Sequence, residues 1–157
     1  MQLVSYDFRG LLSRRFFHNL LPIPALGKFQ IGQVLPDFTL TDIKGTSHKL
    51  SSYRGQPVVL VFTRIFTEKQ YCPFCYPHLL AMREAYSQFL GLGAQVLLII
   101  STEHRQSNVV KQHLGLEMPV LSNPDCKVFK QYGTGQALGA PLSAQFVLDK
   151  EGRLCFQ

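Results

Sequence analysis

Two continuous apolar runs constrain the fold of this chain most. The runs, "PVVLVF" at 57–62 and "AQVLLIIS" at 94–101, are rich in Val, Leu and Ile and contain no charged residue. Strands of this kind are expected where both faces of a sheet are covered. Between them, residues 73–93 carry apolar side chains at helical spacing, and Gly91 and Gly93 close the pattern. This order predicts two parallel strands joined by a helix.

Shorter elements surround this unit. The patterns predict extended segments at 37–42 and 118–123, helices at 102–116 and 124–133, and a hairpin over 144–156. The chain has 157 residues, which is enough for one domain with a sizeable core. We therefore expect an α/β sandwich on a central mixed sheet.

The N-terminal part has a different pattern. Residues 6–20 place apolar side chains near helical spacing, which predicts an amphipathic helix. The stretch "SRRFF" at 13–17 also resembles a twin-arginine export signal, but two prolines and an asparagine interrupt the short apolar part. The helix is the favoured interpretation. We expect an N-terminal helical extension over 1–30 and the main domain over 31–157.

Charge and cysteine content narrow the class of protein. The net charge of +6 comes from scattered Lys and Arg, with no basic block, so we expect no nucleic-acid partner. No run of eighteen apolar residues occurs, so we expect no membrane span. The four cysteines, at 72, 75, 126 and 155, form one close pair and two singles. That usage favours a reducing compartment, the cytoplasm, over a disulfide scaffold.

The close pair lies in "YCPFCYPHL", at 71–79. Cys72 follows a buried strand and precedes a helix, with Pro73 at the favoured first helical position. Unpaired N–H groups and the helix dipole stabilise a thiolate there, which favours Cys72 as the nucleophile. Cys75 lies on the same side of the first turn, where it can attack a mixed disulfide formed at Cys72. Arg64 and Lys69 add positive charge nearby.

Two other interpretations use the same residues. Cys72, Cys75 and His78 could ligate zinc, but a structural zinc needs four ligands, and Cys126 and Cys155 stand apart. Both cysteines of the pair could also be inert core residues. The order of strand, C-x-x-C and helix favours a redox pair, so we expect no metal and no cofactor. Cys126 is expected to be a half-buried structural cysteine, although a distant resolving thiol is the alternative, and Cys155 to pack in the last strand.

Three segments resemble the AhpC/TSA (peroxiredoxin-like) redoxins of the thioredoxin-fold superfamily. They are residues 31–62, which open with "IGQVLPDFTL", then "LSNPDCKVFKQYG" at 121–133 and "AQFVLDKEGRL" at 144–154. The resemblance covers about residues 31–156. It implies a thioredoxin-like three-layer sandwich and thiol chemistry on disulfides or hydroperoxides. Related redoxins add a helix after the last strand; we expect the N-terminal helix to cover that face, or the sequence to continue.

The sequence also departs from this family. Its peroxidases place a proline and a threonine or serine seven and three residues before the reactive cysteine, and here those positions hold Ile65 and Lys69. Ser143 stands where the family has a later arginine, and Pro141 lies two residues before the position of the thioredoxin cis-proline. Arg64 or Thr67 can substitute for the missing groups only if the loop 64–71 folds back over Cys72.

Taken together, these observations predict a thiol-dependent oxidoreductase. Cys72 is the expected nucleophile and Cys75 the resolving thiol, with Pro73, Arg64, Thr67 and Lys69 in supporting positions. The partners expected are a thiol reductant such as thioredoxin or glutathione, a disulfide or hydroperoxide substrate, and a second copy of the chain in a homodimer. The alternative is a redox-inactive thioredoxin-fold binding or regulatory module, which the missing catalytic neighbours would explain.

Overall fold

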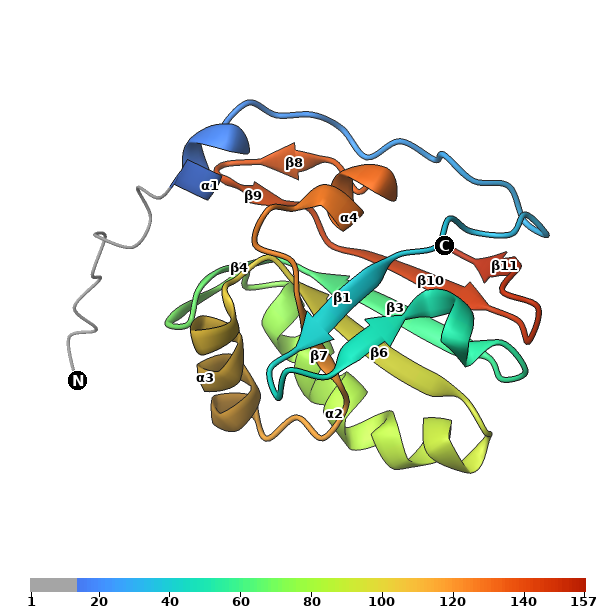
Figure 1. The fold of residues 1–157 in the computed structure, drawn as a ribbon. Coiled ribbons are helices and arrows are strands. Elements are labelled where there is room, and N and C mark those ends of the chain that lie inside the picture. The colour runs from blue at the N-terminus through green and yellow to red at the C-terminus, as the bar shows by residue number, and fades with distance from the viewer. Residues whose placement is uncertain (1–13) are drawn as a thin grey trace.

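The computed structural model describes residues 14–157, which fold around a seven-stranded mixed sheet (Figure 1). The strand order is β11-β10-β3-β6-β7-β1-β2. These strands are β1 Thr39–Asp42, β2 Ser47–Lys49, β3 Val58–Thr63, β6 Gln95–Ile100, β7 Val120–Ser122, β10 Ala144–Leu148 and β11 Leu154–Phe156. Two small hairpins accompany the sheet: β4 Ile65–Thr67 with β5 Gln70–Tyr71, and β8 Gln136–Ala137 with β9 Ala140–Pro141.

The three central strands are parallel, and two helices cross over between them. Strand β3 pairs in parallel with β6, and β6 with β7. The connections are α2 (Cys75–Gly91) and α3 (His104–Leu114). Because right-handed crossovers that step in the same direction lie on the same side of a sheet, both helices cover one face. Their buried residues Leu79, Met82, Val110 and Leu114 share one apolar cluster with alternate residues of β3 and β6.

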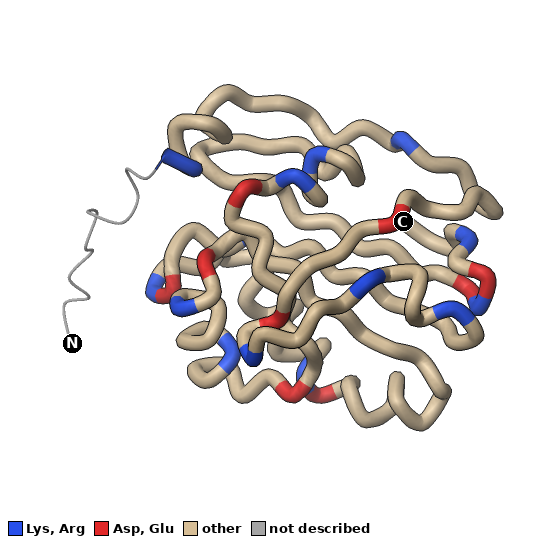
Figure 2. The backbone as a smooth tube through the Cα atoms, viewed as in Figure 1, with Lys and Arg blue, Asp and Glu red and all other residues tan. Residues whose placement is uncertain are grey.

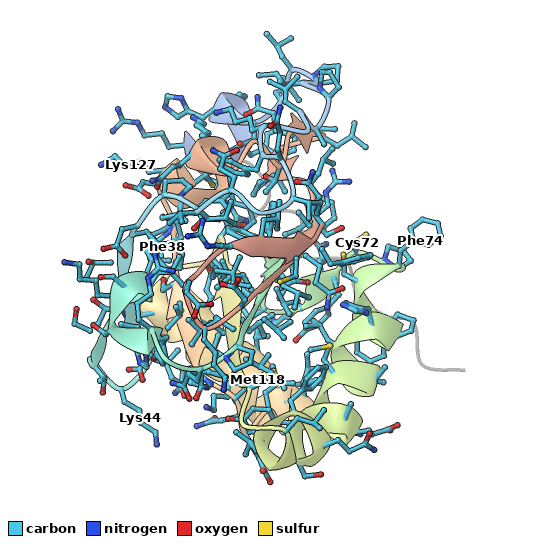
Figure 3. The ribbon with its side chains drawn as sticks, turned by 90° about the vertical axis from the view of Figure 1, so that its right-hand side faces the viewer. Phe38, Lys44, Cys72, Phe74, Met118 and Lys127 are labelled. Atoms are coloured by element: carbon cyan, nitrogen blue, oxygen red, sulfur yellow. The ribbon has the colours of Figure 1, made fainter. Side chains whose placement is uncertain are left out.

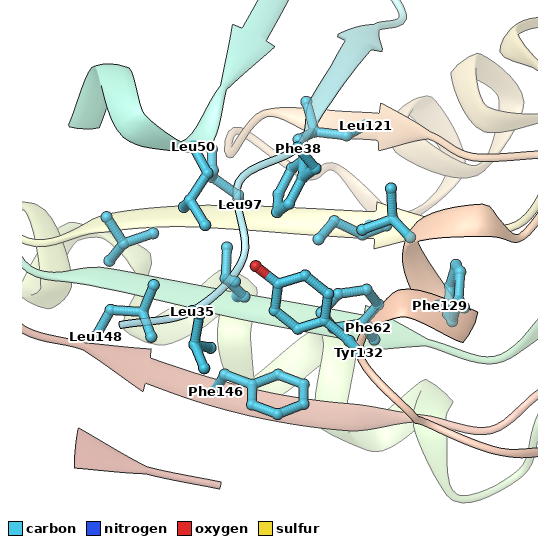
Figure 4. Close-up of a cluster of buried hydrophobic side chains, with 14 of the residues drawn as sticks. Leu35, Phe38, Leu50, Phe62, Leu97, Leu121, Phe129, Tyr132, Phe146 and Leu148 are labelled. Carbon is cyan, nitrogen blue, oxygen red and sulfur yellow. The ribbon is translucent and has the colours of Figure 1, made fainter. Parts of the chain in front are cut away.

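The opposite face is covered by short elements and by extended chain. It holds a second apolar cluster, which includes Phe62, Phe129, Tyr132 and Phe146 (Figure 4). Cover comes from α4 (Lys127–Gln131), the 3₁₀ helix η2 (Leu50–Tyr53) and the segment 29–38. Side chains of β3 and β6 point alternately into the two clusters, which explains why both strands are apolar except at Thr63 and Gln95.

The α/β sandwich on a mixed sheet is confirmed. Helix α1 (Arg14–His18) lies within the helix predicted over 6–20, whose residues 6–13 lie outside the described residues. Extended chain, broken by Pro22 and Pro24, follows α1 and covers the sheet in place of a helix. Its residue Phe29 belongs to the main core.

Charged residues are spread over the chain, as the sequence pattern predicts. Lys and Arg are interspersed with Asp and Glu along the backbone (Figure 2). Within residues 14–157, no helix combines the length and the apolar character needed to span a membrane.

Gly135 gives a stability prediction, because the extended N-terminal chain presses directly on it. Its φ is +78°, and an added Cβ would lie 2.6 Å from both the Ala25 nitrogen and the Ile23 oxygen. We expect Gly135→Ala to lower the free energy of unfolding by about 3 kcal/mol, from backbone strain plus this clash. The matched control is Gly45→Ala, where φ is +86° and nothing lies within 4 Å of the added Cβ. It should cost only about 1–2 kcal/mol. Equal losses in urea unfolding of the two variants would contradict this account.

Candidate active site

The cysteine pair lies at the sheet edge where the parallel strands end. The carboxyl ends of parallel strands meet at one edge, which is where α/β proteins commonly place their sites. At this edge Thr63 pairs with Ile100, and Ile100 with Ser122. The chain leaves β3 at Thr63, forms the β4–β5 hairpin and then reaches Cys72.

The β4–β5 hairpin brings Arg64 to Cys72. Ile65 pairs with Tyr71, and Thr67 pairs with Gln70 near the turn. The next hydrogen bond runs from the Cys72 N–H to the Arg64 carbonyl, at 3.4 Å. The loop 64–71 therefore folds back as a hairpin, and Arg64 is its residue beside Cys72.

The backbone of Cys72 starts the turn that leads into α2. Its carbonyl accepts the N–H groups of Cys75, at 3.0 Å, and Tyr76, at 3.1 Å. The regular helix begins at Cys75, not at Pro73 as predicted, because Pro77 has no N–H to donate to the Pro73 carbonyl. The prediction of Cys72 next to a helical N-terminus survives, with an extra turn of two residues between them.

Both thiols of the pair are reduced and buried. Burial by itself raises the pKa of Cys72. Hydrogen bonds from the N–H groups of Phe74 and Cys75, a hydrogen bond with the Cys75 thiol and the charge of Arg64 act in the other direction. Their sum outweighs burial, so the pKa of Cys72 lies below that of an ordinary thiol. At neutral pH a larger fraction of Cys72 is therefore in the thiolate form than for an ordinary cysteine.

Arg64 is held between two hairpins. Its guanidinium donates to the Ala137 carbonyl of the β8–β9 hairpin and lies 4.8 Å from the centre of the Phe66 ring. Its Nε is buried without a hydrogen-bond partner among the described residues. This guanidinium therefore has one N–H donor that no described residue accepts.

Two other residues predicted to support the pair, Thr67 and Lys69, lie at the turn of the β4–β5 hairpin. The Thr67 hydroxyl accepts the Lys69 N–H at 3.2 Å, at the turn of the hairpin, and the Lys69 side chain is exposed. Arg64 is the cation that lowers the pKa of Cys72. Pro141 lies in β9 opposite Gln136, and no peptide bond within residues 14–157 is cis.

A small pocket opens beside Cys75. Its volume is about 210 Å³, and Thr63, Phe74, His78 and Ser143 are among its lining residues. The Thr63 hydroxyl is buried and has no hydrogen-bond partner among the described residues. Phe74 is 89% exposed and projects outward from the end of α2 that carries the pair (Figure 3). An exposed aromatic ring next to a dithiol suits contact with a large substrate.

The remaining cysteines lie apart from the pair. Cys126 is fully buried, not half-buried as predicted, and its φ of +56° is unusual for a residue other than glycine. Burial raises the pKa of its thiol, and Arg15 acts in the opposite direction. Cys126 and Arg15 line a separate pocket of about 600 Å³. Cys155 is exposed on β11.

Among residues 14–157, no three His, Cys, Asp or Glu side chains gather as a metal site would require.

Comparison with known proteins agrees with this arrangement. The profile of the AhpC/TSA family matches residues 31–156. A thiol-disulfide oxidoreductase ResA of Geobacillus kaustophilus is 31% identical over 125 residues, which are 79% of this chain and 66% of that protein. The chain thus spans just under two thirds of the length of this relative. A chloroplastic peroxiredoxin Q of Triticum aestivum is 32% identical over 159 residues, covering 94% of this chain and 71% of that protein.

A solved structure extends the likeness to the fold. The peroxidoxin BcpB of Mycobacterium tuberculosis superposes with a TM-score of 0.68 at 24% identity, over 80% of this chain and 82% of that one. The fold is therefore thioredoxin-like, as the resemblance implies. Because the family profile covers the whole sheet and the dithiol, the chain belongs to the AhpC/TSA family.

Proposed function

We propose that this chain is a thiol-dependent oxidoreductase in which Cys72 is the nucleophile and Cys75 the resolving thiol. The observation that carries the proposal is the placement of Cys72 between the β4–β5 hairpin and the start of α2, with Cys75 in the first turn. Burial raises the pKa of Cys72, but the backbone hydrogen bonds, the Cys75 thiol and Arg64 together hold it below the ordinary value. A core cysteine without a reactive role has its pKa raised by burial, as Cys126 does. That contrast argues against the redox-inactive binding module.

The reaction consists of two exchanges. The Cys72 thiolate attacks one sulfur of a substrate disulfide, a new S–S bond forms, and the other substrate sulfur leaves as a thiolate. The Cys75 thiol, after losing its proton, attacks Cys72 Sγ and releases the second substrate thiolate. The substrate has then gained two electrons, and the protein carries a Cys72–Cys75 disulfide. A dithiol or two molecules of a thiol, of the thioredoxin or glutathione class, return it to the reduced state.

Protein disulfides are the substrates that the site favours. The exposed Phe74 ring and the pocket beside Cys75 give a polypeptide a surface to contact next to the pair. The relative named as a thiol-disulfide oxidoreductase supports the same assignment. The cytoplasmic location and the homodimer stay predictions.

Hydroperoxide reduction is the second candidate. Arg64 favours it, because a guanidinium beside the attacking thiolate can donate to a peroxide oxygen, and its Nε has no hydrogen-bond partner within residues 14–157. The peroxiredoxin Q relatives support it as well. In this reaction Cys72 is oxidised to a sulfenic acid with release of water or an alcohol, and Cys75 condenses with it to the same disulfide, releasing water.

The pH dependence of alkylation tests the assignment of the two thiols. Because the pKa of Cys72 is lowered, its thiolate persists to lower pH than that of an ordinary cysteine. Iodoacetamide at limiting concentration should label Cys72 before the other three cysteines, and its rate should reach half its maximum at a lower pH than it does with a free cysteine in a model peptide. Mass mapping after oxidation by a protein disulfide should find a Cys72–Cys75 bond. First labelling of Cys75, or a disulfide that includes Cys126, contradicts the proposal.

A further inference from the structure

Residues 14–23 contact both the β4–β5 hairpin and the β8–β9 hairpin, between which Arg64 lies. We name this segment the N-terminal brace. Its first contact is the Arg15 side chain, which reaches the β4–β5 hairpin. The guanidinium donates to the carbonyls of Ile65, at 3.4 Å, and Phe66. It also donates to the hydroxyl of Ser101, at 3.0 Å, and to the Ser101 carbonyl. Arg15 thereby ties β4 to the residue that follows β6.

The rest of the brace is bound to the β8–β9 hairpin. The Gln136 side-chain amide donates to the carbonyls of His18, at 3.2 Å, and Leu21, at 3.1 Å. Ile23 and Gln136 exchange two backbone hydrogen bonds of 2.8 Å, and the Gly139 N–H donates to the Asn19 carbonyl at 3.0 Å. These five bonds fix the brace against β8 and β9.

Arg64 spans the gap between the two braced hairpins. Its backbone carbonyl belongs to the β4–β5 side and accepts the Cys72 N–H, while its guanidinium donates to Ala137 on the β8–β9 side. The place of its charge relative to Cys72 is therefore set by how these two hairpins stand to each other. The brace contacts both hairpins.

The contacts of Arg15 suit a positioning role. Its partners are three carbonyls and a hydroxyl, and no carboxylate of residues 14–157 lies within 4 Å of it. Arg15 is half-buried, and although burial lowers the pKa of its guanidinium, the charge of Glu103 acts in the opposite direction. The hydrogen bonds help to offset the partial loss of water around the guanidinium. A planar fork of donors can hold several acceptors in one geometry, which a lysine ammonium does less well.

We propose that Arg15 is a positioning residue for the dithiol: it holds β4 in place so that Arg64 stays beside Cys72. This role rests on the proposed function, because the position of Arg64 affects activity only if Cys72 is the reacting thiol. Arg15 touches neither thiol of the pair and acts through Arg64.

The test compares Arg15→Met with Arg14→Met, the exposed neighbour on the same helix. The measured quantity is the rate at which iodoacetamide alkylates Cys72 as a function of pH, resolved by mass spectrometry. We expect Arg15→Met to move the half-maximal rate to higher pH and to slow alkylation at neutral pH about 3- to 10-fold. Amide hydrogen exchange across 64–71 should become faster as well. Arg14→Met should leave both quantities unchanged.

A double-mutant cycle decides whether Arg15 acts through Arg64. If it does, Arg15→Met has no further effect on the pH profile in an Arg64→Met background. Full additivity of the two changes overturns the inference, and so does an Arg15→Met protein with a lower Tm but the wild-type profile. If Arg15→Met does not fold, Arg15→Lys replaces it, since lysine keeps the charge but loses the fork; a wild-type profile for this variant also overturns the inference.

These readouts do not require turnover. A wild-type protein that exchanges with no disulfide and reacts with no peroxide refutes the proposed function and leaves the coupling from Arg15 to Cys72 measurable. An active protein whose Cys72 profile ignores Arg15 refutes the further inference alone.

Discussion

Replacing Cys72 by serine should abolish disulfide reduction, whereas replacing Cys75 by serine should stop the protein after its first exchange. A serine hydroxyl does not ionise near neutral pH, so Cys72→Ser removes the nucleophile itself. We expect kcat to fall by about 10³-fold or more, because few single substitutions slow catalysis as much as the removal of the attacking group. Turnover is measured with a protein disulfide as substrate and an excess of dithiol.

Cys75→Ser should instead accumulate a mixed disulfide with the substrate. Its Cys72 keeps the Arg64 charge and the backbone hydrogen bonds, and loses only the bond with the neighbouring thiol. One equivalent of substrate thiol should be released in a rapid phase, and the adduct should be visible by mass spectrometry. Cys155→Ser is the control, because this thiol is exposed on β11, away from the pair. If Cys72→Ser instead accumulates the mixed disulfide and Cys75→Ser does not react, Cys75 is the nucleophile and Cys72 the resolving thiol.

The sheet and its two crossover helices could be predicted because their signals are local and strong. A strand buried on both faces is almost entirely apolar, as β3 and β6 are, and their short length and flanking turn residues distinguish such runs from a buried helix. The hairpin over 144–156 has its signal in the turn, where Gly152 has a φ of +75°. The position of Cys72 beside a helical N-terminus follows from the same local order of strand, cysteine pair and helix.

The surroundings of the dithiol could not be predicted in the same way. Strands β4 and β5 are joined at Glu68 and Lys69, where no glycine or asparagine indicates a hairpin turn. The contacts of Arg15 are more remote still, because they link residues about 50 and 86 positions apart in the chain. Side-chain bonds of that range leave no periodicity in the sequence. Arg64 and the N–H groups beside Cys72 could thus be proposed from the sequence, whereas the contacts of Arg15 and the hairpin that places Arg64 are identified by the structure alone.

Hydrogen peroxide should oxidise Cys72 about 10²–10³ times more slowly than it oxidises a dedicated peroxiredoxin. A fast peroxidase site donates hydrogen bonds to both peroxide oxygens while the thiolate attacks, and the loss of one such donor costs about that factor. Here the charge of Arg64 acts on Cys72. The position that holds the second donor in the family's peroxidases, three residues before the reactive cysteine, holds Lys69, whose side chain is exposed, and Thr67 lies near the turn of the hairpin, away from Cys72. Disulfide exchange needs no such donor pair, only a thiolate and a resolving thiol.

Stopped-flow oxidation of the reduced protein by peroxide and by a protein disulfide measures the two rates directly. Arg64→Met separates the two possible roles of the arginine. If Arg64 only raises the thiolate population, both rates fall by a similar factor, because both reactions start from the same thiolate. If Arg64 also binds peroxide, the peroxide rate falls much further than the disulfide rate. A wild-type protein that reacts fast with peroxide and shows this selective loss contradicts the expectation, and makes Arg64 the peroxide-binding arginine of a peroxidase.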